Sequence, residues 1–204
     1  MESGRSGFGL NGELGPLVFT TVTGDTKKVL DLKNVFTTNI KEKKSSLFFN
    51  PPINVVIEFE NKGNVHVTPQ GRVFIHKGED FNNYLATYEL NETSGTVLPN
   101  TTRQYIFPWD DSFINTVKQE VDGKVDYSTE YNWDNLSKLR MGKYNITVLY
   151  SYKNMEGEII QGGGEASFWV IPLPLIIIIS LLILVTLSVS FVIYQKRGKK
   201  KKFN

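Results

Sequence analysis

Cysteine is absent from all 204 residues of the chain, and histidine occurs only twice. A disulfide framework, a thiolate zinc site and a cysteine nucleophile are therefore excluded. A folded body has to be held by its own apolar core, and about 170 residues are enough to form one. The two histidines, His66 and His76, stand apart from any cluster of carboxylates, so we interpret them as surface or turn residues rather than as a metal pair.

Signatures of catalysis are also missing. The chain contains no HExxH, P-loop or GxGxxG pattern, and no Lys-Ser/Thr pair follows the glycine run 162–164. That run predicts a bend or bulge before the last strand. The acidic residues considered as Ca²⁺ ligands fit no calcium-loop spacing; they are Asp110, Asp111, Glu130 and Asp134. We therefore expect a non-enzymatic protein without a cofactor or a metal.

Charge is absent between Glu165 and Lys196. The part before this gap, residues 1–165, holds all 21 acidic residues and 17 of the 23 basic ones, a net charge of −4. A mildly acidic body offers no basic face to phosphates, which argues against nucleic acid as a partner. The other six basic residues follow the gap: Lys196, Arg197, Lys199, Lys200, Lys201 and Lys202.

The uncharged segment predicts a transmembrane helix over residues 172–194. Leu175 to Tyr194 are almost wholly apolar, and twenty helical residues span roughly 30 Å, the thickness of a bilayer's hydrocarbon core. Trp169 and Tyr194 flank the segment like an interfacial aromatic belt. A buried core helix is the alternative. The hydroxyls within residues 186–190 either mark a helix–helix contact or bond their own backbone carbonyls.

The orientation follows from the basic tail. Basic residues are retained on the cytoplasmic side of a membrane, so residues 195–204 are expected to form a cytoplasmic basic stop with the body outside. This is the arrangement of a single-pass protein of the plasma membrane, with the lipid bilayer as its first partner. The alternative is a tail-anchored protein of reverse orientation, which would carry six positive charges outward.

Strand signals dominate the body. In INVVIEFE (53–60), Val55, Ile57 and Phe59 occupy one face and polar residues most of the other, which is typical of a half-buried strand. Similar segments recur between Gly, Pro and Asn turns and predict an all-β body, an antiparallel β-sandwich over residues 25–171. The expected strands are 16–22, 29–38, 47–52, 53–60, 71–77, 83–90, 103–109, 143–152 and 165–171.

Residues 110–141 break this rhythm with a polar, acidic stretch that contains scattered aromatics. The stretch is too long for a simple connection, and we expect a short hairpin around Asp122-Gly123 and a helical turn near WDNLSKL. Long loops on rigid sandwiches often carry recognition, which makes Tyr127, Tyr131 and Trp133 the candidate interaction residues. The alternative is an insertion that contacts nothing.

Four motifs follow one another in a familiar order. They are FENKGNVHVTPQG (59–71), VLPNTTR (97–103), GKY (142–144) and FWVIP (168–172). With this order and spacing, the chain resembles the membrane-proximal immunoglobulin-like domain of bacterial cell-surface proteins of the candidate-phyla type, which are related to WxL-interacting surface proteins. The resemblance implies an immunoglobulin-like β-sandwich followed directly by a single C-terminal transmembrane α-helix.

The first motif also has a local structural reason. Gly63 and Asn64 are expected to take left-handed conformations in a turn, and Pro69-x-Gly71 is expected to form a tight turn. In longer relatives of this kind, an export signal and a first sandwich domain precede this one. Residues 1–24 accordingly look like a linker and the last strand of a missing preceding domain.

Taken together, these features predict a membrane-anchored, cell-surface protein of the binding or adhesion type. Its expected partner is a cell-wall polymer or another envelope protein. The expected binding surface is the 110–141 segment or an exposed sheet edge. A structural spacer or an accessory subunit of a membrane complex is the alternative.

Overall fold

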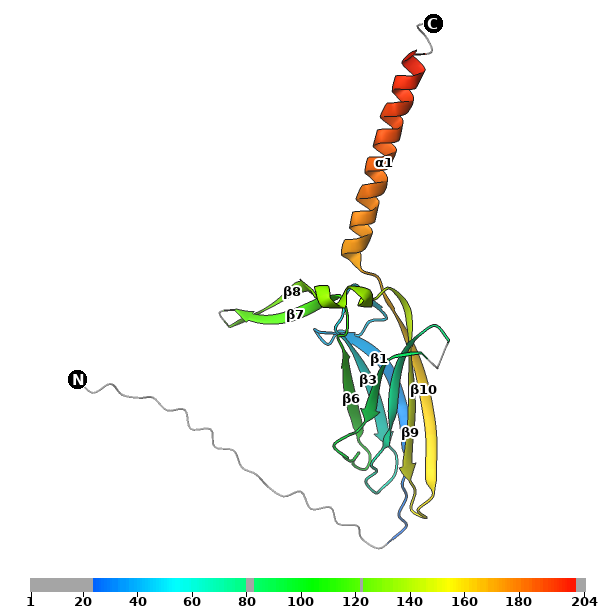
Figure 1. The fold of residues 1–204 in the computed structure, drawn as a ribbon. Coiled ribbons are helices and arrows are strands. Elements are labelled where there is room, and N and C mark those ends of the chain that lie inside the picture. Colours follow the sequence, from blue (N-terminus) through cyan, green and yellow to red (C-terminus); the bar gives the residue numbers. More distant parts are fainter. Residues whose placement is uncertain (1–23, 80–82, 122, 201–204) are drawn as a thin grey trace, which may run out of the picture.

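A computed structural model describes residues 24–79, 83–121 and 123–200, and Figure 1 shows their arrangement. The strand expected at 16–22 lies outside the described residues, as does nearly all of the expected linker. The elements are β1 (Leu30–Asn39), β2 (Leu47–Phe48), β3 (Ile53–Asn61), β4 (Gln70–Lys77), β5 (Tyr84–Leu90), β6 (Thr102–Trp109), β7 (Ile114–Val121), β8 (Lys124–Tyr131), the 3₁₀ helix η1 (Trp133–Lys138), β9 (Gly142–Lys153), β10 (Ile159–Val170) and α1 (Leu173–Lys200).

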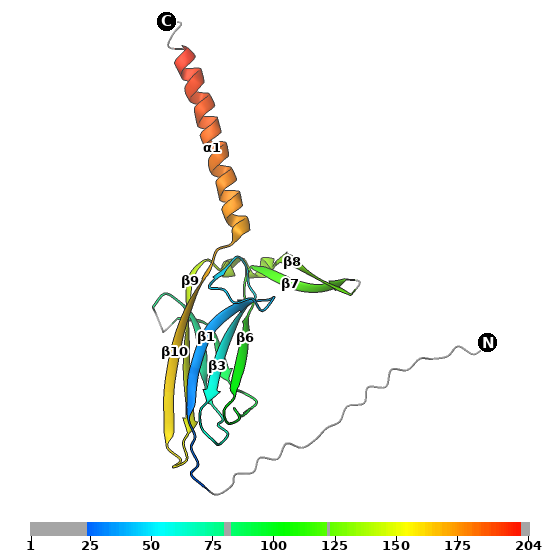
Figure 2. The ribbon, with the colours of Figure 1, turned by 180° about the vertical axis from the view of Figure 1, so that it is seen from behind.

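Two sheets face each other and form the body, which we call the β-domain. One sheet has the order β1-β3-β6 and the other β2-β10-β9-β4-β5. All pairings are antiparallel except that of β2 with β10, which is parallel. Figure 2 shows the two layers from behind, with α1 continuing from one end. The predictions of a β-rich body and of one C-terminal apolar helix are confirmed.

The core lies between the two sheets because alternate residues of each strand point inward. On β3 the buried positions include Ile53, Val55, Ile57 and Phe59, which matches the alternation read from the sequence. The ring of Phe59 lies 4.8 Å from that of Tyr150 on β9 in the opposite sheet. Burial of each such side chain contributes about 1.5–3 kcal/mol, so the sheets are held together without disulfides.

The structure corrects the prediction of a bend at the glycine run 162–164. Gly162–Gly164 do not bend the chain before the last strand; they lie within β10, in unbroken register with Tyr150, Leu149 and Val148 of β9. A Cβ at Gly162 would come within 2.5 Å of the Tyr150 ring. Gly162 and Gly164 therefore leave room for the side chains of Tyr150 and Leu32, and Gly163 leaves room for the carbonyl oxygen of Val148.

The expected turn glycines are corrected in the same way. Neither Gly63 nor Asn64 has a positive φ, and Gly71 lies inside β4 rather than in a turn. An added Cβ would collide with the carbonyl oxygen of Lys27 at Gly63, and with that of Leu149 at Gly71. Both glycines are thus required by the close approach of another backbone segment.

Residues 110–141 contain the expected hairpin and helical turn, β7–β8 and η1. The hairpin is longer than expected, with eight residues in each strand. It projects sideways from the end of the β-domain at which α1 begins (Figure 1). The base of the hairpin and η1 are therefore placed beside the start of the apolar helix.

Candidate functional site

The junction between β10 and α1 fixes the position of the whole candidate site. Only Ile171 and Pro172 separate the last strand residue from the first helical one. The backbone N–H of Trp169 donates to Ser46 O at 2.8 Å, and that of Ile171 donates to Phe48 O at the same distance. Because β2 holds the exit of β10 in this way, the start of α1 is tied to the β-domain.

Helix α1 contains one stretch, Leu173–Phe191, that is long and apolar enough to cross a bilayer. No part of this stretch is buried in the protein, so the alternative of a buried core helix is wrong. Trp169 and Tyr194, the expected interface residues, flank it and are both exposed. Of the expected basic stop, Lys196, Arg197, Lys199 and Lys200 belong to the end of α1. Lys201 and Lys202 lie outside the described residues.

Three hydroxyl groups of α1 bond within the helix. Ser180 and Thr186 donate to the carbonyl oxygens of Ile177 and Ile183, and Ser188 donates to that of Leu184, each at 2.8 Å. Such bonds occupy the hydroxyl protons that a helix–helix contact would use. Of the two interpretations of these side chains, the structure supports backbone bonding.

The β7–β8 hairpin is attached to the β-domain at its base. The N–H of Thr116 donates to Pro51 O at 2.6 Å, and that of Phe113 donates to Lys138 O at 3.2 Å. The N–H of Asn132 donates in turn to Phe113 O at 2.8 Å. These bonds join the hairpin both to the segment before β3 and to η1, so the base of the hairpin is fixed.

An ionic cluster around Asp111 links the two ends of the inserted segment. Its carboxylate accepts hydrogen bonds from Lys138 Nζ at 2.7 Å and from Arg140 Nη2 at 3.0 Å. Arg140, whose side chain is 11 % exposed, also lies over the Trp109 ring, 5.3 Å from its centroid. Both oxygens of Asp111 thus serve to join the two ends of the insertion. Sequence reasoning missed this role and weighed Asp111 as a calcium ligand.

The three candidate interaction residues do not form one patch. Tyr131 and Trp133 both pack on Phe113, with ring centroids 5.8 and 5.2 Å away. Tyr127 is four residues before Tyr131 in β8, and its ring lies under the ammonium group of Lys41, 4.3 Å from the ring centroid. Trp133 is 73 % exposed. The structure therefore brings Tyr131 and Trp133 together at the hairpin base and leaves Tyr127 nearer its tip.

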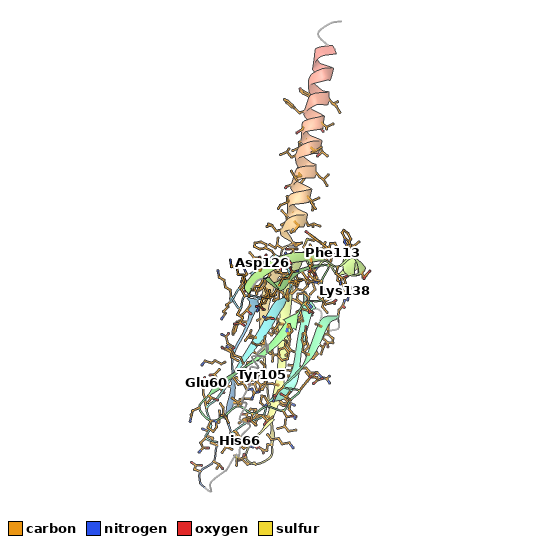
Figure 3. The ribbon with its side chains drawn as sticks, turned by 90° about the vertical axis from the view of Figure 1, so that its left-hand side faces the viewer. Glu60, His66, Tyr105, Phe113, Asp126 and Lys138 are labelled. Atoms are coloured by element: carbon orange, nitrogen blue, oxygen red, sulfur yellow. The ribbon has the colours of Figure 1, made fainter. Side chains whose placement is uncertain are left out.

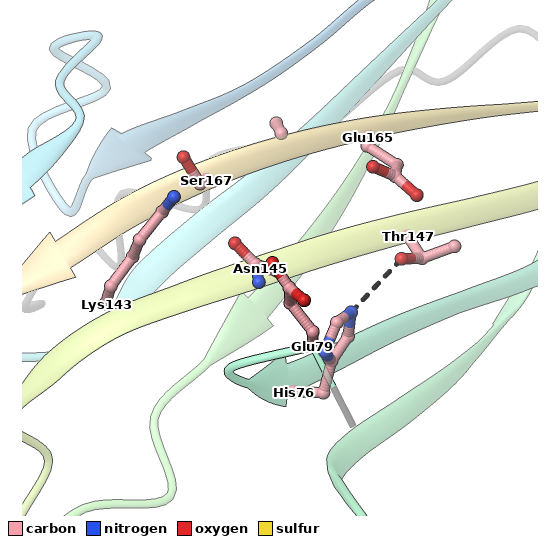
Figure 4. Close-up of a pocket in the computed structure, with 8 residues that line it drawn as sticks. His76, Glu79, Lys143, Asn145, Thr147, Glu165 and Ser167 are labelled. Carbon is pink, nitrogen blue, oxygen red and sulfur yellow. Dashed lines mark hydrogen bonds between the residues drawn. The ribbon is translucent and has the colours of Figure 1, made fainter. Parts of the chain in front are cut away.

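A second candidate surface is a shallow polar pocket of about 650 Å³ on the outer face of the larger sheet. Figure 4 shows side chains from β4, β9, β10 and the turn after β4 around it. They include His76, Glu79, Lys143, Asn145, Thr147, Glu165 and Ser167. The alternation of each strand places some of these on one face, but only the register of β4 and β10 with β9 brings them together.

His76 corrects the expectation of a surface or turn histidine, because it lies in β4 and is only 2 % exposed. Its Nδ1 lies 2.9 Å from Gly78 O, and its Nε2 lies 3.2 Å from Thr147 Oγ1. A carbonyl oxygen can only accept, so Nδ1 carries a proton and donates to Gly78 O. The ring thereby links β4 with β9 and with the turn after β4.

Neither a metal-ligand group in the described part of the chain nor a match to a known protein adds to the geometry described above. Within the described residues, no group of three or more His, Asp or Glu is placed to hold a metal ion. No protein-family model matches the chain, and no curated protein sequence matches it either.

Proposed function

We propose that this protein is a non-enzymatic, membrane-anchored cell-surface protein of the binding or adhesion type. Its β-domain is immunoglobulin-like and lies outside the plasma membrane, α1 is the single membrane span, and the basic end of α1 is cytoplasmic. The observation that carries the proposal is the two-residue connection, Ile171 and Pro172, between β10 and α1. A domain joined so closely to an anchor is held at the membrane surface.

Charge supports this orientation. The segment before α1 is net acidic. Of the seven residues 196–202, all except Gly198 are basic. Translocation of such a cluster is unfavourable, and clusters of this kind remain on the cytoplasmic side. The anchored β-domain then faces outward, where it is available to other components of the cell envelope.

The partner we propose is another envelope protein, bound along the β7–β8 hairpin. The hairpin is a separate two-stranded sheet, and within the described residues no third strand pairs with β8. An unpaired strand edge can receive a strand of a partner. One face of the hairpin also carries Tyr127 and Tyr131, which supply aromatic contact area. Because it projects sideways beside α1 (Figure 1), the hairpin is aimed at neighbours in the same membrane.

A structural spacer or accessory subunit is the second candidate. Such a role would place α1 against partner helices, and it is favoured by the exposure of the apolar residues around the whole helix. The internal bonding of Ser180, Thr186 and Ser188 favours the first candidate, because these three hydroxyl groups donate to the backbone of α1 itself and not to another helix.

Site-specific photo-crosslinking in cells tests the proposed partner surface. A photoreactive amino acid at Thr129, which is exposed on β8, is expected to yield an adduct of defined mass. The matched control is Thr102, which is exposed at the far end of β6 and is expected to yield none. The adduct should disappear when Tyr127 and Tyr131 are both replaced by alanine.

Other outcomes separate the alternatives. A carbohydrate-bearing smear at Thr129 in place of a discrete adduct would favour a cell-wall polymer. An adduct that survives the two tyrosine replacements and is lost only when α1 is exchanged for another apolar helix would favour the accessory subunit. Equal crosslinking at Thr129 and Thr102 would contradict a hairpin site.

A further inference from the structure

Large, exposed apolar side chains gather at the end of the β-domain where α1 begins. We call six of them the juxtamembrane rim; each is between 46 and 73 % exposed. They are Leu47, Phe49, Trp133, Leu136, Met141 and Trp169. Figure 3 places Phe113 and Lys138, which adjoin the η1 part of this rim, beside the start of α1 and far from His66.

The rim has two halves that come from distant parts of the sequence. Leu47 on β2 pairs directly with Trp169 on β10, and Phe49 follows β2. Trp133 and Leu136 belong to η1, and Met141 precedes β9, where its N–H donates to Tyr144 Oη at 2.9 Å. Both halves are thus attached to strand ends at the same end of the two sheets.

The η1 half is held in position although it buries none of its own residues. Asn132 caps the helix by accepting a hydrogen bond from the N–H of Asp134 at 3.2 Å. Lys138 at its other end is bonded to Asp111 at 2.7 Å. A short helix fixed at both ends, with tryptophan and leucine turned outward, presents a defined apolar surface rather than a collapsed one.

We propose that the juxtamembrane rim docks into the headgroup region of the lipid bilayer, so that the β-domain rests on the membrane and the β7–β8 hairpin runs along its surface. The occupant is the boundary between phospholipid headgroups and acyl chains. The argument is continuity: Trp169 of the rim is four residues from Leu173, where the candidate membrane span begins. Tryptophan is enriched at this depth because its ring is apolar and its N–H is polar.

The surrounding charges fit a headgroup layer. Lys41, Lys43 and Lys44 are exposed in the loop between β1 and β2, next to the Leu47 half of the rim. The ammonium groups of Lys41 and Lys44 lie over the rings of Tyr127 and Phe36, each 4.3 Å from the ring centroid. The positive charge of this loop favours nearby lipid phosphates while the apolar residues of the rim enter more deeply. This inference rests on the proposed membrane placement and adds to it a second point of contact, which limits the tilt of the β-domain about the Ile171–Pro172 connection.

Tryptophan fluorescence provides the test, because the chain has only three tryptophans and they lie in different places. Trp109 is 1 % exposed in the core, while Trp133 and Trp169 belong to the two halves of the rim. The full chain is reconstituted in nanodiscs at one copy per disc, which removes a second copy as a possible cover. Emission is compared between discs of phosphatidylcholine and discs of the same lipid brominated on its acyl chains.

Three variants assign the quenching. The double variant gives the emission of Trp109 alone. Trp133→Phe gives the emission of Trp169 in addition to that of Trp109, and Trp169→Phe gives the emission of Trp133 in addition to that of Trp109. We expect brominated lipid to reduce the Trp133 and Trp169 signals to a similar degree and to leave the double variant unchanged. Phenylalanine retains the aromatic contact with Phe113, and the constant Trp109 emission verifies the fold.

The outcomes are distinct. Quenching of Trp169 without quenching of Trp133 would overturn the docking of the rim and leave the membrane placement intact. Absence of quenching at both would overturn the membrane placement itself. A further variant, Leu136→Asp in the Trp169→Phe background, is expected to lower Trp133 quenching, whereas Leu98→Asp, at an exposed site of the loop before β6, should not. Equal effects of these two would also contradict the proposal.

Discussion

The β-domain and the inserted segment 110–141 are stabilised by different kinds of interaction. The β-domain holds its two sheets together with a continuous apolar core that includes Phe59, Trp109 and Phe168. The insertion buries Phe113 and Ile114 and otherwise depends on backbone hydrogen bonds and on the Asp111 cluster. The β-domain therefore carries, at one end, a long element that is stabilised differently from its own core.

The largest expected effect of a single change lies in the core. Phe59→Ala removes a fully buried ring that packs against Tyr105 and Tyr150, and it should lower the free energy of unfolding by about 3–5 kcal/mol. Chemical denaturation of the detergent-solubilised chain, followed by near-ultraviolet circular dichroism, measures this. Phe113→Ala should leave that transition nearly unchanged while it frees the hairpin. Equal losses of unfolding free energy from Phe59→Ala and Phe113→Ala would contradict the difference between the two regions.

The next effect concerns close packing between strands. Gly71→Ala places a Cβ against the carbonyl oxygen of Leu149, and the resulting displacement of backbone should cost about 1–3 kcal/mol of stability. The denaturation midpoint reports it. Gly24→Ala is the matched control, because no atom lies within 4 Å of its added Cβ. A neutral Gly71→Ala would show that β4 and β9 are less tightly packed than described.

A smaller and local effect is expected from the Asp111 cluster. Asp111→Asn removes the charge that Lys138 and Arg140 share, and it should lower the local stability of the insertion by about 1–2 kcal/mol. Hydrogen exchange should become faster in β7, β8 and η1 and stay constant in β3 and β9. The control is Asp31→Asn, which breaks the exposed pair with Lys62. Faster exchange throughout the β-domain would mean that the two regions are not separate.

The smallest effect is a dependence on alkaline pH at the boundary between the two regions. Burial, with a contribution from Asp110 and Asp111, raises the pKa of Tyr88 from 10.0 to about 12, and its hydroxyl donates to Pro108 O at 2.8 Å. The folded state therefore holds this proton more tightly than the unfolded chain. The associated stability is complete below pH 10 and is lost as pH rises toward 12.

Tyr88→Phe should reduce the slope of stability against pH within this window and have little effect on the slope at neutral pH. Denaturation midpoints at a series of pH values measure both slopes. An unchanged alkaline slope would show that other groups, such as Tyr105, Tyr144 and Tyr150, whose pKa values are also raised by burial, account for the loss.

Local patterns in the sequence predicted much of this molecule. Alternation in segments such as 53–60 was sufficient to find the strands of both sheets, because the period of a strand is visible in a few residues. The hairpin was found from Asp122-Gly123 and the helical turn from WDNLSKL. The C-terminal helix was evident because no charge interrupts the apolar run after Glu165.

The corrections concern contacts between distant residues. Gly63 and Gly71 were interpreted as turn residues because glycine favours turns, but the requirement comes from Lys27 and Leu149. The buried position of His76 depends on the pairing of β4 with β9. The Asp111 cluster joins residues 27 and 29 positions apart. The sequence carries no short-range signal of register or of which strands become neighbours.

The central claim is that the β-domain and the basic tail lie on opposite sides of the membrane, and the lack of native cysteine allows a direct measurement. Single cysteines at Lys124, exposed in β8, and at Lys199 in the tail are treated in intact cells with a membrane-impermeant maleimide. We predict labelling of Lys124→Cys alone, and of both after permeabilisation. Labelling of Lys199→Cys but not Lys124→Cys in intact cells would contradict the account.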